Sequence, residues 1–143
     1  MKFWLLTAIT YLALSINPAL AGVAVIVNKG NPIDEIEKHD LEDLYMGRHL
    51  YFPNRHQAVR LDLPPNSTIR QQFYRKLVNR SVAEVNAYWA RLLFTGLASP
   101  PQVLQSTTEV IEFVRKHENA IGYVDSAQLE GSASSVKVLT VFE

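Results

Sequence analysis

The apolar and polar positions after residue 21 predict strands that are separated by helices. Residues 22–28 form an apolar run rich in β-branched side chains and closed by turn residues 29–32, which predicts a strand covered on both faces. Residues 59–63 alternate apolar and charged side chains before two prolines, which predicts a strand that leads into a turn. Residues 120–124 and 136–141 predict two further strands.

Helical spacing appears between these strands. Leu41, Leu44 and Tyr45 lie on one helical face, and Gly47 follows as a C-terminal stop. A second helix is predicted where apolar residues recur every fourth position after a group of N-cap residues, namely Ile69, Phe73 and Leu77 after Asn66, Ser67 and Thr68.

Two capping boxes predict the starts of two more helices. Each pairs a serine with a glutamate three residues on, Ser81 with Glu84 and Ser106 with Glu109. Each helix should bury one apolar stripe, made of Val82, Val85, Trp89, Leu92 and Leu93 in the first and of Val110, Ile111 and Val114 in the second. We interpret Trp89 as a core residue rather than a platform for a ligand.

This alternation predicts a single α/β domain over residues 22–143, with a mixed sheet between two layers of helices. The sequence shows no internal repeat, and no linker divides residues 22–143 into smaller units.

Residues 1–21 have the features of a cleaved secretory signal peptide. Lys2 precedes a short apolar run, and Ala19 and Ala21 supply the small residues of a cleavage site. A membrane anchor is the alternative, but the run is shorter than the roughly 20 residues that span a bilayer, and Pro18 interrupts it. We therefore expect the mature protein to be periplasmic.

Composition excludes several classes of function. The 14 basic and 14 acidic residues balance, so a basic surface for nucleic acid is not expected. The absence of cysteine excludes disulfides, cysteine nucleophiles and cysteine-bound zinc. The four histidines have no metal-site spacing, and no Gly-x-Ser-x-Gly segment is present. We expect no enzyme activity, no metal and no cofactor.

Candidate chemistry lies between the second predicted strand and the helix after it. Arg60 offers a planar cation, and Asn66, Ser67 and Thr68 stand at a helix start, where unpaired N–H groups favour an oxyanion. Asp62 either holds the Arg60 guanidinium or accepts the proton of a hydrogen phosphate. A purely structural interpretation is also open, in which Asn66 or Ser67 is only an N-cap and Arg60 and Asp62 form a surface pair.

Several short segments, in this order, are similar to those of one family. They are residues 25–28 with Asn31 and Pro32, residues 40–48, Phe73, Tyr88 with Trp89, residues 94–96, Pro100 with Pro101, and residues 119–124. With them the chain resembles one lobe of the periplasmic phosphate-binding component of ABC transporters, a type II periplasmic binding protein. The resemblance implies that Arg60, Asp62, Ser67 and Thr68 match an Arg-Ser-Asp-Gly-Ser-Gly-Thr segment that lines the anion.

The chain departs from this family pattern in two ways. The glycines of the segment are missing and Pro64 and Pro65 lengthen the turn, which reduces the number of backbone N–H donors. The chain is also long enough for only one of the two lobes that close over a ligand. We therefore predict a module that binds phosphate or a similar oxyanion weakly, or after completion by a membrane transporter, a sensor or a second copy.

The same features allow an alternative function. A lobe that has lost ligand binding would be an accessory protein that docks on an envelope or sensor partner. The aromatic loop of Tyr51, Phe52 and Pro53 is a candidate contact surface if it is exposed.

Overall fold

A computed structural model describes residues 22–129 and 135–143. The predicted signal peptide, residues 1–21, lies outside the described residues. The elements follow one another along the chain as β1 (Val23–Asn28), α1 (Lys38–Tyr45), β2 (Val59–Asp62), α2 (Thr68–Val78), α3 (Val82–Thr95), β3 (Gln102–Val103), α4 (Thr107–Lys116), β4 (Ala120–Asp125), a 3-10 turn (Ser126–Leu129) and β5 (Val136–Phe142).

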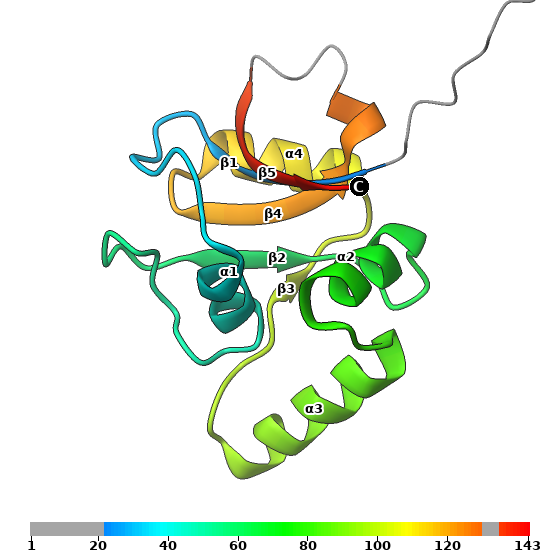
Figure 1. Ribbon diagram of the computed structural model, residues 1–143. Coiled ribbons are helices and arrows are strands. Elements are labelled where there is room, and N and C mark those ends of the chain that lie inside the picture. Colours follow the sequence, from blue (N-terminus) through cyan, green and yellow to red (C-terminus); the bar gives the residue numbers. More distant parts are fainter. Residues whose placement is uncertain (1–21, 130–134) are drawn as a thin grey trace, which may run out of the picture.

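The strands form one mixed sheet in the order β3-β2-β4-β1-β5 (Figure 1). β1 runs antiparallel to both β4 and β5, with Val25 opposite Tyr123 on one side and Thr140 on the other. β2 runs parallel to both β4 and β3. The predicted mixed sheet is confirmed, and the apolar run of β1 is buried because β1 lies inside the sheet.

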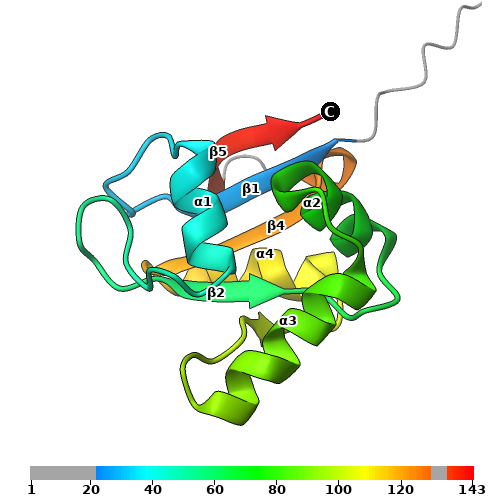
Figure 2. The ribbon, with the colours of Figure 1, turned by 60° about the horizontal axis from the view of Figure 1, so that its bottom comes forward.

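Helices cover both faces of this sheet. Neighbouring residues of a strand face opposite sides, and in β4 these are Gly122 and Tyr123. A Cβ atom added to Gly122 would lie 2.6 Å from Val110 of α4, whereas Tyr123 stacks on Phe73 of α2 with the ring centroids 3.8 Å apart. α4 therefore covers one face, while α1 and α2 cover the other (Figure 2). This is the three-layer arrangement that the sequence predicts.

The predicted ends of the first helices are confirmed. α1 is followed by Gly47 at φ +72°, a left-handed conformation that favours glycine. The Ser67 side chain accepts a hydrogen bond from the backbone N–H of Arg70 and is the N-cap of α2. Ser81 and Glu84 form a complete capping box at the start of α3.

Several local predictions are wrong in part. Ser106 accepts from the Glu109 N–H, but the Glu109 carboxylate accepts from Gln105 N, so the second capping box is incomplete. Phe52 is buried, whereas Tyr51 and Pro53 of the predicted aromatic loop are exposed. Leu93 is exposed because the last turns of α3 extend beyond the layer that covers the sheet.

Other local predictions agree with the structure. Trp89 is buried, as are Val110, Ile111 and Val114 of α4. Strand β3 had no counterpart in the sequence pattern. Within the described residues, no helix has both the length and the apolar character that a membrane span needs.

Candidate functional site

The predicted anion site lies where β2 passes into α2. Pro64 and Pro65 have no N–H, and they shape a turn in which the Ser67 N–H donates to the Pro64 carbonyl at 2.9 Å. The Ser67 side chain then caps α2. Asn66 and Thr68 are exposed and Ser67 is half-buried, so these three residues form an accessible mouth at the N-terminus of α2.

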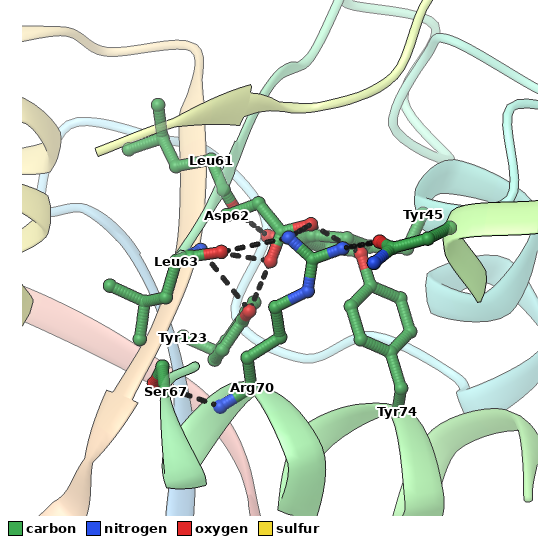
Figure 3. Close-up of polar contacts among 9 residues, drawn as sticks. Tyr45, Leu61, Asp62, Leu63, Ser67, Arg70, Tyr74 and Tyr123 are labelled. Atoms are coloured by element: carbon green, nitrogen blue, oxygen red, sulfur yellow. Dashed lines mark hydrogen bonds and ion pairs between the residues drawn. The ribbon is translucent and has the colours of Figure 1, made fainter. Parts of the chain in front are cut away.

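Asp62 lies behind this mouth and is buried (Figure 3). Its carboxylate accepts hydrogen bonds from the Tyr74 hydroxyl at 2.6 Å, from the Leu63 N–H at 2.8 Å and from the Tyr123 hydroxyl. A buried carboxylate needs such donors because it has lost its water. Asp62 is therefore satisfied by the protein itself.

Arg70 supplies the charge that faces Asp62. Its guanidinium lies 3.6 Å from the Asp62 carboxylate, and it donates to the Leu63 carbonyl at 2.8 Å and to the Asn86 side chain at 2.7 Å. Arg70 and Tyr74 are one turn apart on α2, so the same helical face carries both partners of Asp62. Arg70, Tyr74 and Tyr123 were not predicted as site residues, although the i, i+4 spacing of Arg70 and Tyr74 places them on one helical face.

Arg60 has a different environment. Its guanidinium donates to the carbonyls of Leu44 at 3.2 Å and Ser99 at 2.8 Å, and it lies 5.7 Å from the centre of the Trp89 ring. Burial lowers the pKa of Arg60 below its ordinary value. Within the part of the chain that the structure describes, the Arg60 side chain has no hydrogen bond or ion pair to Asp62 or to residues 66–68.

The structure thus divides the five predicted site residues into two groups. Asn66, Ser67 and Thr68 lie together at the surface, whereas Arg60 and Asp62 are buried and hold separate sets of internal partners. The alternative of a surface pair between Arg60 and Asp62 is wrong, because both side chains are buried and Asp62 faces Arg70 instead. Arg60 and Asp62 share a face of β2, but that face meets different elements along its length.

The tyrosines around Asp62 are strongly perturbed. Burial, and then the negative charge of Asp62, raise the pKa values of Tyr45, Tyr74 and Tyr123 well above the ordinary value. These hydroxyls therefore remain protonated at neutral pH and act as donors. Tyr45 donates to the Leu61 carbonyl at 2.8 Å. Both oxygens of the Asp62 carboxylate therefore accept hydrogen bonds from tyrosine hydroxyls.

The electrostatics of α2 differ from those of α3 and α4. All three helices begin with a serine N-cap, but the third residue after the cap is Glu84 in α3, Glu109 in α4 and Arg70 in α2. A glutamate there compensates the partial positive charge of the helix start, and an arginine does not. The start of α2 is therefore the more favourable of these sites for an external anion.

The described residues contain no metal site, because no three or more histidine or acidic side chains lie close enough together to hold an ion. His39 and His49 instead lie 3.3 and 3.7 Å from the buried carboxylate of Asp43, which also accepts from Arg48 at 2.9 Å. This cluster lies on α1 and the loop after it.

The sheet and its helices form one α/β lobe, and this fold is shared with part of several larger solved structures. The model is similar to a putative phosphate ABC transporter substrate-binding protein with bound phosphate from Clostridium perfringens, with a TM-score of 0.66 and 21% identity over 84% of this chain and 44% of that chain. It is also similar to an ABC-type phosphate transport receptor from Vibrio cholerae, with a TM-score of 0.65 and 18% identity over 84% and 46%.

PstS from Borrelia burgdorferi is a third similar structure, with a TM-score of 0.58 and 15% identity over 84% of this chain and 47% of that chain. The chain therefore spans less than half the length of these proteins. No family model matches the sequence, and no curated protein matches it.

These similarities confirm the predicted lobe at the level of fold. The first of these structures is described as a substrate-binding protein and the second as a transport receptor.

Proposed function

We propose that the protein is a periplasmic binding module for phosphate or a similar oxyanion, and that Asn66, Ser67 and Thr68 hold the ion at the mouth of α2. The supporting observation is that the first turn of α2 has no acidic residue, whereas those of α3 and α4 have Glu84 and Glu109, in a lobe with the fold of phosphate-binding proteins. The periplasmic location depends on the predicted signal peptide, residues 1–21.

The physical basis of binding is the free end of the helix. The first turn of α2 presents backbone N–H groups, and the Thr68 hydroxyl adds a donor beside them. Arg60 and Asp62 belong to the proposed site as the residues behind the turn. Each would contact the ion only after leaving its internal partners, because their polar atoms are already hydrogen-bonded.

We expect the affinity to be low. Three or four charge-assisted hydrogen bonds at about 1.5–3 kcal/mol each give roughly 5–12 kcal/mol before an association cost of at least about 4 kcal/mol. One lobe leaves the ion open to water on one side, which lowers the gain further. The dissociation constant should therefore be in the high micromolar to millimolar range, unless a transporter, a sensor or a second copy completes the cleft.

Thermal unfolding and calorimetry of the purified protein with phosphate test this proposal, with chloride at equal ionic strength as the reference. Phosphate should raise Tm, and Thr68→Val should remove the gain because it deletes one donor at the mouth. Thr107→Val is the matched control, since Thr107 is the first residue of α4 after the Ser106 cap. Equal gains in the parent and in Thr68→Val would exclude this site, and heats equal to dilution at millimolar phosphate would exclude binding.

A second candidate function is supported by an exposed apolar ridge, made of Leu93, Phe94 and Leu97 at the C-terminal end of α3. Phe94 is 94% exposed and Leu97 is 75% exposed. Clustered exposed apolar side chains are typical of contact surfaces. In this candidate function the protein is an accessory module that docks on an envelope or sensor partner.

A pull-down from periplasmic extract tests this second function. The parent protein should retain a stoichiometric partner that Phe94→Asp loses, while Val138→Asp, on the exposed side of β5, should still retain it. Recovery of no stoichiometric partner, or equal recovery by both variants, would count against the accessory function.

A further inference from the structure

A groove lies beside the apolar ridge, between α2, α3 and the segment that leads into β3. Its volume is about 310 Å³, and its apolar lining includes Trp89, Ala90, Leu93, Pro100, Pro101 and Val103. Asp62, Arg70 and Asn86 supply the polar part of the lining. Leu93 belongs to both surfaces, so the ridge and the groove are continuous.

Two residues of this groove carry buried donors without partners. Arg70 and Trp89 are each 5% exposed, and the Arg70 Nε–H and Trp89 Nε1–H have no hydrogen-bond acceptor within the described part of the chain. A buried donor without an acceptor costs about 1–3 kcal/mol, so folded proteins rarely keep one. Here the two residues that carry such donors come from different helices, and both line the same groove. This pairing indicates a ligand that supplies acceptors.

The charges in the groove indicate which acceptor is favoured. The positive charge of Arg70 already faces the carboxylate of Asp62 at 3.6 Å. A ligand with a full negative charge would be repelled by Asp62 in this groove. The ligand and Asp62 would share the single positive charge of Arg70, and little water is present to screen them. A neutral acceptor such as an amide carbonyl has no such penalty.

We propose that this groove binds an extended, apolar peptide segment of a partner protein, whose backbone carbonyls accept from Arg70 Nε–H and Trp89 Nε1–H. The inference depends on the second candidate function and is independent of phosphate binding at α2. β3 is an edge strand of the sheet and Val103 lines the groove, so an extended chain can run beside it. Apolar side chains of the segment would cover Leu93 and Leu97.

Nitrogen-15 NMR of the purified protein tests this inference at the two donors. The probe is an N-acetylated, C-amidated tripeptide of leucine, valine and alanine, used up to about 50 mM because a fragment of this size binds in the millimolar range. The Trp89 indole N–H and the Arg70 Nε–H should move downfield in a saturable way. The chain has two tryptophans, Trp4 and Trp89, and Trp89→Phe assigns the indole signal.

Matched variants separate the groove from other surfaces. Leu93→Ser should weaken the response to the peptide at least several-fold, whereas Val138→Ser, an exposed apolar position on β5, should leave it unchanged. Acetate is the anionic probe, and it should move the two signals less than the peptide does. Larger shifts with acetate than with the peptide would overturn the neutral-acceptor inference, and so would the absence of any peptide response.

The outcomes of the three experiments are distinguishable. A partner lost by Phe94→Asp in the pull-down, without peptide shifts at the two donors, would keep the accessory function and reject the groove as its site. A peptide response that Thr68→Val leaves unchanged would show that the groove and the mouth of α2 act separately.

Discussion

The hydroxyl of Tyr74 lies 2.6 Å from Oδ2 of Asp62, so α2 is joined to the end of β2 by a buried hydrogen bond. The Tyr123 hydroxyl donates to the other carboxylate oxygen and adds β4 to the same contact. Arg70 faces this carboxylate from α2. Asp62 therefore connects three elements behind the mouth of α2.

Asp62→Asn should lower the free energy of unfolding by about 3–5 kcal/mol. The amide cannot accept from both tyrosine hydroxyls, and Arg70 loses its buried counter-charge. Asp34→Asn is the control, because Asp34 forms an exposed pair with Lys137 that should contribute at most about 1 kcal/mol. Urea unfolding measures both variants, and equal midpoints would contradict the assigned role of Asp62.

The buried tyrosines predict a loss of stability at alkaline pH. The pKa values of Tyr45, Tyr74 and Tyr123 are raised in the folded protein, so the unfolded chain releases these protons first, near its ordinary value of 10.0. The contribution of the three protonated tyrosines to the free energy of unfolding is therefore complete below about pH 10 and is lost as the pH rises above it. Because three protons are involved, the free energy of unfolding should fall by about 4 kcal/mol for each pH unit in this range.

Urea unfolding at several pH values between about 9 and 11.5 measures this slope. The range is centred near the pKa of free tyrosine, which is about 10. Tyr45→Phe should reduce the slope by about one third, since one of the three protons is removed. A slope equal to that of the parent would show that Tyr45 does not contribute.

Arg60→Ala should destabilise the protein by about 2–5 kcal/mol, because it leaves the carbonyls of Leu44 and Ser99 without their donor and removes the contact with Trp89. Arg75→Ala, at an exposed position of α2, should have little effect. Chemical unfolding with and without phosphate separates the two roles of Arg60. A variant as stable as the parent that no longer gains stability from phosphate would place the guanidinium on the ion.

Gly47→Ala should cost about 2–4 kcal/mol. Gly47 has φ +72°, and an added Cβ atom would lie 2.6 Å from Cη2 of Trp89. Gly96→Ala is a close control, because Gly96 has φ +70° with no atom within 4 Å, so only the backbone cost of about 1–2 kcal/mol applies. If thermal or urea unfolding gave equal losses for both variants, the contact with Trp89 would be unimportant.

We expect the ionised carboxylate of Asp43 to contribute stability that is lost in acid. A hydrogen bond from Arg48, with smaller effects of His39 and His49, holds the pKa of Asp43 below its ordinary value of 3.8. This contribution is complete above that value and disappears as the pH falls through the lowered pKa. Asp43→Asn should therefore flatten the acid limb of the stability curve below about pH 4, which urea unfolding of the parent and the variant measures.

The sequence by itself determined where most elements begin and end, because these features depend on neighbours within a few residues. Ser67 and Ser81 cap their helices through N–H groups three positions on, and Gly47 follows α1 because its backbone adopts φ +72°. The apolar run of β1 likewise indicated a strand covered on both faces, and with it the α/β class.

Only the tertiary structure decided which partners the charged residues take. Arg60 and Asp62 share one face of β2, and this proximity suggested a pair. Arg60 instead meets carbonyls 16 and 39 positions away, and Asp62 meets hydroxyls 12 and 61 positions away. Leu93 is exposed for the same reason, since helical spacing defines a face but not whether another element covers it. Contacts of this range depend on how the layers pack, which no local pattern contains.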